Sequence, residues 1–349
     1  MILFKTGKIG LGGGFLSIIP RIKYIHGYDD IISVDNLLEA WKEFVKGKRK
    51  RRDVQEFERD MMTNIILLHT DLAHQTYQHA SYEAFKINDP KPRDIHKATV
   101  RDRLLHHALH RKLYPFFDRT FIADSFSCRL GKGTHKALER FRSFAYQASH
   151  NHTKTIWVLK CDIRKFFASV DQGLLIDILD ARIRDNDITR LLAKIIYSFS
   201  STRRGIGLPL GNLTSQLLVN IYMNEFDQFV KHRLKAKYYI RYADDFVIMS
   251  RDRSGLINLL GSIKEFLAGR LRLQLHPDKI SIKTIASGVD YLGWVNFPDH
   301  RVVRTKTKRR MFRQIRDKQG KKETLQSYLG LLSHGNSKKL KDTIQLSRE

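Results

Sequence analysis

The chain has 349 residues and carries 63 Lys and Arg against 36 Asp and Glu, which gives a formal net charge of +27. Hydrophobic residues make up 42% of it, enough for a sizeable core, so the composition excludes a wholly disordered protein. A positive surplus of this size repels itself, and it favours a polyanionic partner such as nucleic acid.

Two cysteines, Cys128 and Cys161, are too few for a disulfide scaffold or a four-cysteine zinc site, and they fit a reducing compartment. No stretch approaches the roughly 20 apolar residues that span a bilayer, so we expect no membrane association. The apolar patch within residues 1–28 is short and interrupted by glycines, which argues against a secretion signal. We expect a flexible leader there and a cytoplasmic protein.

The N-terminal part of the chain predicts helices. Apolar residues recur at helical spacing around Trp41, and the basic run KGKRKRR follows them. The segment NDPKPRD, residues 88–94, is a turn-rich break. A further helix is predicted over residues 101–118, with its end near Pro115.

The middle of the chain mixes strands with helices. The β-branched, apolar residues 155–163 predict a buried strand that carries Asp162 at its end. Residues 238–250 predict two short strands that meet at Asp244 and Asp245. This order of elements indicates an α+β sheet backed by helices.

The three aspartates are candidate metal ligands. Asp244 and Asp245 at a hairpin tip repel each other unless a cation compensates them, although Asp is also a common turn residue. Carboxylate oxygens suit Mg²⁺, and two ions roughly 4 Å apart would hold the attacking and leaving oxygens of a phosphoryl transfer. Together with Asp162, the pair predicts a site for two Mg²⁺, which Mn²⁺ could replace.

The motifs LKCDIRKFF, GLPLGNLTSQ and YADD follow one another in an order and at intervals that resemble the palm of reverse transcriptases. The resemblance runs from about residue 30 to the end. It implies a right-hand polymerase fold with fingers, a palm of antiparallel sheet backed by helices, and a small helical thumb. It also implies an RNA-directed DNA polymerase, a nucleotidyltransferase in which Asp162, Asp244 and Asp245 are catalytic and Ile163 joins them in the metal site.

Further residues match motifs that contact the nucleotide and the primer. Phe167, five residues after Asp162, matches the aromatic gate that excludes a 2′-hydroxyl, although an aromatic after a strand is usually ordinary core. Lys279 resembles the candidate general acid. The resemblance implies nucleotide binding by Lys91, Arg93, Phe167, Leu210, Gly211 and Gln216, and a primer-gripping hairpin at Tyr291, Leu292, Gly293 and Trp294.

One motif departs from the common pattern. Most reverse transcriptases carry Gln-Gly where this chain has Leu210-Gly211, and Ser-Pro where it has Ser215-Gln216. The substitution resembles the reverse transcriptases of diversity-generating retroelements, relatives of the group II intron enzymes that copy a template RNA while misreading adenines. Because a leucine cannot hydrogen-bond, base discrimination is expected to loosen at Leu210. The alternative is an ordinary apolar residue at a helix entry.

The resemblance implies template RNA, cDNA or primer, and deoxynucleoside triphosphates as partners, with a small basic accessory protein oligomer. A prokaryotic or phage origin is expected. The alternatives are a phage-defence or otherwise unclassified bacterial reverse transcriptase, and an RNA-binding splicing helper. The predicted parts are a leader (1–28), a helical region with fingers (29–154), a palm with finger insertions (155–298) and a basic helical thumb (299–349).

Overall fold

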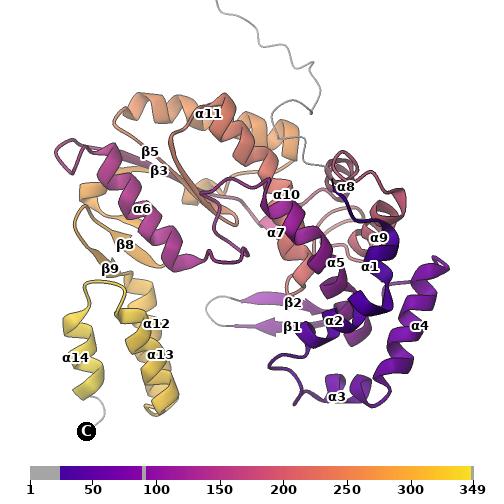
Figure 1. The fold of residues 1–349 in the computed structure, drawn as a ribbon. Coiled ribbons are helices and arrows are strands. Elements are labelled where there is room, and N and C mark those ends of the chain that lie inside the picture. The colour runs from indigo at the N-terminus through magenta and orange to yellow at the C-terminus, as the bar shows by residue number, and fades with distance from the viewer. Residues whose placement is uncertain (1–23, 89–91, 347–349) are drawn as a thin grey trace, which may run out of the picture.

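The computed structural model describes residues 24–88 and 92–346, and Figure 1 shows their arrangement. Helices α1 to α5 and a hairpin lie at one end, three C-terminal helices lie at the other, and a sheet backed by helices lies between them. The fold begins before the predicted boundary at residue 28, since the ring of Tyr24 meets that of Phe116 with centroids 5.3 Å apart. The rest of the predicted leader, residues 1–23, lies outside the described residues.

The N-terminal helices are amphipathic and pack around the long helix α5. On α2, for example, Leu37, Trp41 and Phe44 are buried on one face, at the spacing that the sequence predicts. The helices are α1 (Tyr28–Ile32), α2 (Val34–Phe44), α3 (Arg52–Arg59), α4 (Met61–Ala73) and α5 (Val100–Asp118).

Helix α5 does not end near Pro115, so that prediction is wrong. The helix runs through the proline to Asp118. Pro115 is exposed, whereas Phe116 and Phe117 are buried in the core. Their burial offsets the roughly 3 kcal/mol that a proline costs inside a helix, because each aromatic side chain contributes about 1.5–3 kcal/mol when buried.

The turn-rich segment 88–94 lies between two paired strands that the sequence did not reveal. They are β1 (Glu83–Ile87) and β2 (Arg93–Lys97), antiparallel and largely exposed. Without a buried face they lack the apolar alternation by which a strand is recognised. Lys91 lies outside the described residues.

The central sheet has the order β4-β5-β3-β6, and every neighbouring pair is antiparallel. The strand expected to carry Asp162 at its end and the two strands expected to meet at the aspartate pair are confirmed. The strands are β3 (Trp157–Asp162), β4 (Tyr238–Tyr242), β5 (Asp245–Ser250) and β6 (Ser281–Thr284).

Alternate residues of the sheet face two different cores. Leu159 and Phe246 belong to a cluster with helices α10 (Leu213–Gln228) and α11 (Arg253–Leu271). Val158 and Val247 belong to a second cluster on the other face, with α6 (Thr134–Ala148). The period of two along each strand therefore fixes which helices cover which face.

A second sheet links the central sheet to the C-terminal helices. Three strands form it rather than a single hairpin, in the order β7-β8-β9. The elements are β7 (Val289–Tyr291), β8 (Trp294–Asn296), β9 (Arg301–Val303), α12 (Thr305–Asp317), α13 (Lys322–Leu332) and α14 (Lys338–Leu346).

Shorter elements complete the described part of the chain, in which no helix is long and apolar enough to cross a membrane. Strands and helices are mixed in the way that the α+β prediction requires. The remaining elements are α7 (Phe166–Ser169), α8 (Gln172–Asp180), α9 (Asn186–Tyr197), a π-helical turn (Phe229–Arg233) and two 3₁₀ turns (Pro277–Lys279 and Ile285–Ser287).

Candidate active site

Two of the three predicted catalytic aspartates are direct neighbours across the central sheet. Asp162 is the last residue of β3, Asp245 is the first of β5, and the two pair in register. Residues opposite each other in an antiparallel pair have Cβ atoms about 5 Å apart on one face, and like charges there destabilise the sheet. The fold thus holds two carboxylates together at an energetic cost.

The third aspartate, Asp244, lies in the tight turn between β4 and β5. The preceding residue, Ala243, has a left-handed backbone with φ of 54°, a strained conformation for a residue with a side chain. The amide of Ile163 donates to the Asp244 carbonyl at 3.1 Å, which ties the end of β3 to this turn. All three aspartates therefore lie at one end of the sheet.

A buried arginine holds the same turn from inside the molecule. Arg241 is 1% exposed and lies on β4. Its guanidinium donates to the Asp227 carboxylate at 2.7 and 2.6 Å and to the Ala243 carbonyl at 3.0 Å. It also donates to the side-chain oxygens of Asn220 (3.3 Å) and Ser125 (3.1 Å). These bonds fix the strained turn to helix α10.

The carboxyl groups of the turn are shielded from water, which penalises their charged forms. Burial raises the pKa of Asp245 to about 7, and the charges of Asp162 and Asp244 add to this effect, while Lys160, 3.8 Å away, opposes it. The pKa of Asp244 is also raised, mainly by burial and next by the charge of Asp162, whereas the charges of Lys279 and Arg93 lower it. The site is thus short of positive charge despite the basic chain.

Lys279 lies beside the first aspartate. Its ammonium donates to Asp162 Oδ1 at 2.7 Å. It comes from a 3₁₀ turn that is joined to the end of β3, because the His276 amide donates to the Asp162 carbonyl at 2.8 Å. The structure therefore brings the predicted general acid to the site, where it is the cation that pairs with Asp162.

The Leu210 loop contacts the strand that continues from the fingertip. The His96 amide of β2 donates to the Leu210 carbonyl at 3.0 Å, and the Asn212 side-chain amide donates to the His96 carbonyl at 3.2 Å. Gly211 has φ of +108°, and a Cβ on it would lie 2.9 Å from the Ile95 side chain. Only glycine fits this close approach.

The other predicted nucleotide contacts lie around this loop. Phe167 is half-buried on α7, and its carbonyl accepts from the Leu208 amide at 2.8 Å. Gln216 is half-buried in the first turn of α10. Arg93 is exposed at the start of β2. The charge of Arg93 lowers the pKa of Asp244, and its contact with a triphosphate stays a prediction.

The predicted primer-gripping hairpin is only partly accessible. The side chains of Tyr291 and Trp294 are buried in the core, with the Tyr291 ring stacked on Phe141 at 5.5 Å. Leu292 and Gly293 form the turn, with φ of 50° and 87°. A primer can therefore meet the backbone of the turn, but it cannot meet the rings of Tyr291 and Trp294.

Part of this arrangement fits a divalent cation. Among the described residues, Asp245 Oδ1 is buried without a hydrogen-bond partner, and Asp162 forms an ion pair with Lys279. Within residues 24–88 and 92–346, however, no three His, Cys, Asp or Glu side chains are placed to hold a metal ion by themselves. The metal site therefore stays a prediction.

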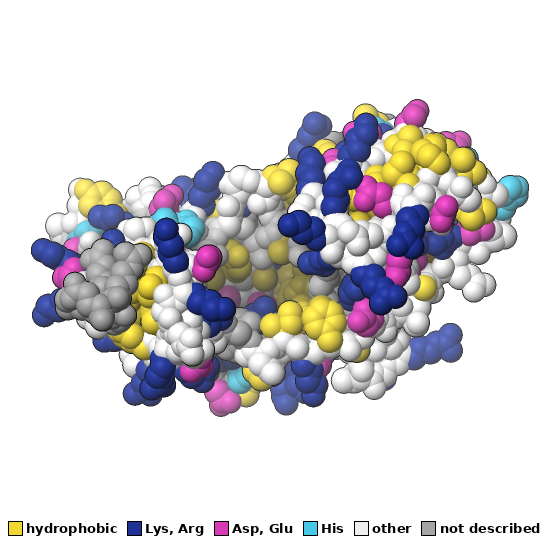
Figure 2. Space-filling model, turned by 90° about the horizontal axis from the view of Figure 1, so that it is seen from below, with side chains coloured by type: hydrophobic (Ala, Val, Ile, Leu, Met, Phe, Trp, Pro, Cys, Tyr) yellow, Lys and Arg dark blue, Asp and Glu magenta, His cyan; other side chains and the backbone are white. Residues whose placement is uncertain are grey.

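The surroundings of the site favour a polyanion. Figure 2 shows that the face seen from below is hollowed between the two ends of the molecule, with Lys and Arg side chains on both sides of this central hollow. Helix α12, at one end, buries Met311 and Ile315 and turns a basic face outward. Such a surface attracts the phosphate backbone of a nucleic acid.

Residues 86–295 match the family described as "Reverse transcriptase (RNA-dependent DNA polymerase)", which is more than half of the chain. The chain belongs to the reverse transcriptase family. The predicted α+β right-hand polymerase fold is thereby confirmed, with the palm sheet and its helices as described.

Curated relatives of this reverse transcriptase include Protein YkfC of Escherichia coli, strain K12, with 26% identity over 62% of this chain and 65% of that protein. Group II intron-encoded protein LtrA of Lactococcus lactis subsp. cremoris is 24% identical over 64% of this chain and 47% of that protein. The chain therefore spans less than two thirds of the length of these relatives. Similarity to a group II intron-encoded protein confirms the predicted relation to that branch.

Among solved structures, apo telomerase from Candida tropicalis, truncated from its C-terminal domain, aligns with a TM-score of 0.49 at 10% identity. The alignment covers 70% of this chain and 60% of that one.

Sequence reasoning missed the network that supports the catalytic turn. Arg241 stands within the apolar strand YYIRY, and Asp227 stands on a helix that is otherwise buried. A charged residue in an apolar stretch is seldom fully buried unless it is paired. The presence of Arg241 and Asp227 in such stretches could therefore have predicted a buried ion pair. The docking of His96 on Leu210 carried no such signal, because neither strand of the hairpin was recognisable.

The raised pKa values predict a pH-dependent stability in the absence of metal. Since the folded state binds protons at Asp245 more tightly than the unfolded chain, stability falls as the pH rises from about 4 to about 7. Asp245→Asn should therefore raise the melting temperature in EDTA at about pH 8 and change it little at about pH 4. Thermal unfolding at both pH values measures this. The same change in melting temperature at both pH values would contradict this prediction.

Proposed function

We propose that this reverse transcriptase is an active RNA-directed DNA polymerase, which extends a primer with deoxynucleotides on a template RNA. The observation that carries the proposal is the meeting of Asp162, Asp244 and Asp245 at one end of the palm sheet. A protein that only binds RNA has no need for three acids that repel one another. Extension of a primer on an RNA template by the purified protein tests this function.

Asp162, Asp244 and Asp245, with the backbone of Ile163, would hold the two Mg²⁺ ions. When bound, such ions neutralise the triphosphate and activate the primer 3′-hydroxyl. The strained turn and its Arg241 support position the acids before any substrate arrives. Lys279 donates a hydrogen bond to Asp162 at the site, so it remains the candidate general acid for the leaving pyrophosphate.

Nucleotide selection is assigned to the loop that joins the palm to the fingers. Support comes from the Phe167 backbone, whose carbonyl accepts from the Leu208 amide two residues before Leu210, and from the half-buried state of the side chain. A ring in that position would exclude a 2′-hydroxyl by its bulk. Arg93 and Lys91 would meet the triphosphate from the hairpin.

We further propose that the enzyme belongs to a diversity-generating retroelement and misreads template adenines. Support comes from the Leu210-Gly211 and Ser215-Gln216 departures and from the position of Leu210. The Leu210 carbonyl accepts a hydrogen bond from the His96 amide. The group that Leu210 would offer a nucleotide is therefore its apolar side chain. The partners proposed with this function are a structured template RNA, its cDNA and a small basic accessory oligomer, bridged by the RNA because this chain carries +27.

Leu210→Gln should lower misincorporation, most of all opposite template adenine. Gln restores a polar contact at the nucleotide, and one hydrogen bond in a dry pocket contributes about 1–3 kcal/mol, or roughly 5- to 150-fold in selectivity. Deep sequencing of cDNA made on one template with all four bases measures the error spectrum.

Leu210→Ile is the matched control, because it keeps an apolar side chain and should keep the errors. An adenine error rate unchanged by Leu210→Gln would leave Leu210 an ordinary packing residue.

A second candidate function, a reverse transcriptase of the group II intron branch without adenine errors, is favoured by the similarity to LtrA. The wild-type error spectrum distinguishes the two functions.

A further inference from the structure

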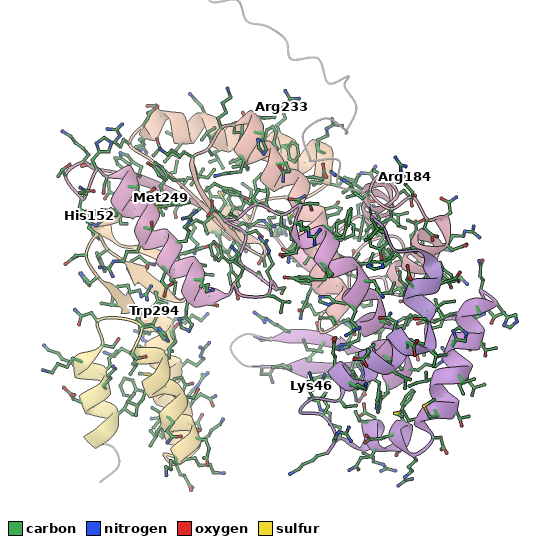
Figure 3. The ribbon with its side chains drawn as sticks, viewed as in Figure 1. Lys46, His152, Arg184, Arg233, Met249 and Trp294 are labelled. Atoms are coloured by element: carbon green, nitrogen blue, oxygen red, sulfur yellow. The ribbon has the colours of Figure 1, made fainter. Side chains whose placement is uncertain are left out.

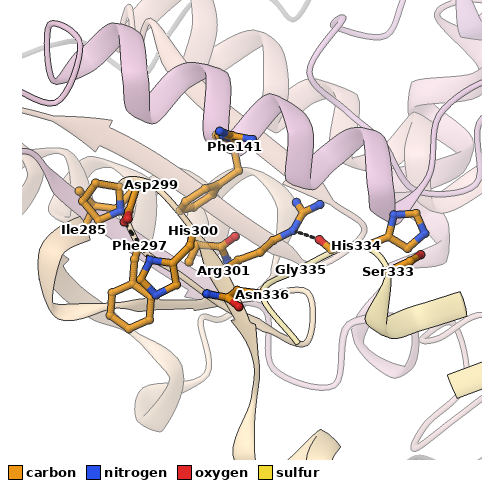
Figure 4. A pocket seen from close by; sticks show the side chains of 13 residues that line it. Phe141, Ile285, Phe297, Asp299, His300, Arg301, Ser333, His334, Gly335 and Asn336 are labelled. Atoms are coloured by element: carbon orange, nitrogen blue, oxygen red, sulfur yellow. Dashed lines mark hydrogen bonds and ion pairs between the residues drawn. The ribbon is translucent and has the colours of Figure 1, made fainter. Parts of the chain in front are cut away.

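The outer side of helix α6 lines a groove whose lining includes none of the three catalytic aspartates. Two cavities, of about 310 and about 500 Å³, make up this α6 groove, and they share Arg142, Pro298 and Asp299. It runs between α6 and the connection from β8 to β9, and Figure 4 shows its first cavity. Residues 333–336, from the loop between α13 and α14, close one end.

One wall of the groove is a stripe of exposed residues on α6. His135, Glu139, Arg142 and Tyr146 follow one another at intervals of three or four residues, so they lie along one side of the helix. Tyr146 is 48% exposed, although a tyrosine ring gains from burial. The stripe therefore presents a guanidinium and an exposed aromatic ring one helical turn apart, and the ring of His152 meets the Tyr146 ring edge-on with centroids 5.2 Å apart.

The opposite wall presents a second aromatic surface. The rings of Phe297 and His300 stack with centroids 4.8 Å apart and planes within 12°. The Phe297 amide donates to the His300 carbonyl at 2.8 Å, and His300 Nδ1 lies 2.8 Å from Asp299 Oδ1. The connection from β8 to β9 is thus a compact turn that carries a preformed pair of stacked rings.

Two arginines, Arg142 and Arg301, face the groove, which Glu139 and Asp299 also line. Arg301 donates to the His334 carbonyl, and its guanidinium lies over the Trp294 ring at 5.5 Å. Burial lowers the pKa of Arg301, the charge of Glu139 opposes this shift, and the positive charge of Arg142 adds to it. Within the part of the chain that the structure describes, Arg142 makes no hydrogen bond or ion pair. A bound phosphate would relieve this repulsion.

The closed end of the groove is tightly built. A Cβ on Gly335 would lie 2.1 Å from the Trp294 ring, so the loop backbone rests directly on that ring. The Asn336 amide donates to the Arg301 carbonyl at 2.8 Å, and the rings of His135 and His334 stack at 3.7 Å. These contacts hold Arg301 in place before a ligand binds.

We propose that the α6 groove binds a single-stranded segment of nucleic acid outside the central hollow. A phosphate would lie between Arg142 and Arg301, and bases would stack on Tyr146 and on the Phe297–His300 pair. Aromatic faces alternating with cationic side chains are the features by which proteins hold single strands without reading their sequence. The chain's charge of +27 favours the same ligand. This inference does not depend on polymerase activity.

The test measures binding of a fluorescein-labelled, single-stranded RNA of about 12 nucleotides, a length within the usual range of single-strand sites. The full-length protein is first saturated with an unlabelled template–primer duplex, which occupies the central hollow if the proposed function is correct. Arg142→Ala and Tyr146→Ala should each weaken binding by about tenfold, the worth of one stacked base or one such contact. Arg142→Ala should also make the slope of log affinity against log salt concentration shallower, by the amount expected for about one phosphate contact.

Arg184→Ala is the matched control, since it removes the same charge from an exposed residue at the far end of the molecule from the groove residue His152 (Figure 3). It should change binding by less than twofold. All three substitutions should leave primer extension on a short duplex unchanged, which shows that the variants fold. A DNA strand of the same sequence is measured in the same way, to identify which molecule supplies the single strand. Tighter binding of RNA assigns the groove to the template, and tighter binding of DNA assigns it to the product.

Arg142→Ala and Tyr146→Ala proteins that bind the labelled strand as tightly as Arg184→Ala protein would overturn the inference. So would complete displacement of the labelled strand by the duplex. A protein that binds the strand through Arg142 and Tyr146 but extends no primer would contradict the proposed polymerase while leaving the groove intact.

Discussion

Asp244→Asn should abolish cDNA synthesis, with a loss of about a thousandfold or more. The substitution keeps the size and the hydrogen-bonding shape of the side chain and removes only its charge at the ions. Because Asp244 lies in a turn held by the Ile163 amide and the Arg241 guanidinium, the backbone should stay in place. Primer extension under single-turnover conditions measures the loss, and a filter-binding assay measures the affinity for template–primer.

Asp278→Asn supplies the matched control. Asp278 lies on the 3₁₀ turn beside the site, its side chain is 87% exposed, and it belongs to no predicted functional set. Its substitution should leave extension within twofold, which separates a loss of local charge from a loss at the metal ligands. Wild-type extension by the Asp244→Asn protein would remove Asp244 from the catalytic set.

Asp227→Ala should destabilise the fold by about 3–5 kcal/mol, because it leaves Arg241 buried without its counter-ion. Tyr239 loses a partner as well, since its hydroxyl donates to the same carboxylate at 2.7 Å. Urea unfolding monitored by circular dichroism measures the change. The partly exposed pair of Arg272 and Asp171 is the comparison, and Arg272→Ala should move the unfolding midpoint far less.

The double substitution Arg241→Met and Asp227→Leu separates stability from catalysis. Apolar side chains of similar volume can replace a buried ion pair at little cost, so much of the stability should return. The bond to the Ala243 carbonyl does not return, so the catalytic turn should stay loose and primer extension should remain low. Full activity in a stable double variant would show that the network supports only the fold.

The sequence predicted the centre of this molecule better than its edges. Asp162 and the Asp244–Asp245 pair were placed correctly because buried strands and a two-residue turn leave strong local patterns. The hairpin β1–β2 has no buried face, so its strands left no pattern. Pro115 predicted a helix end from local chemistry, and the burial of the aromatic residues after it prevailed.

Contacts between distant parts of the chain could not be predicted. The pairing of Arg241 with Asp227 and the contact of Lys279 with Asp162 join residues 14 and 117 positions apart. Burial, too, depends on the whole fold. Tyr291 and Trp294 matched a hairpin that grips a primer, but their rings belong to the core between the palm and the C-terminal helices.

The most direct measurement of the central claim is primer extension by the purified wild-type protein on a defined RNA template. We predict full-length cDNA with deoxynucleotides and Mg²⁺, no product with EDTA, and little product when ribonucleotides replace deoxynucleotides, because Phe167 is the proposed gate against a 2′-hydroxyl. Absence of any cDNA from folded protein that binds the template–primer would contradict the assignment as an RNA-directed DNA polymerase.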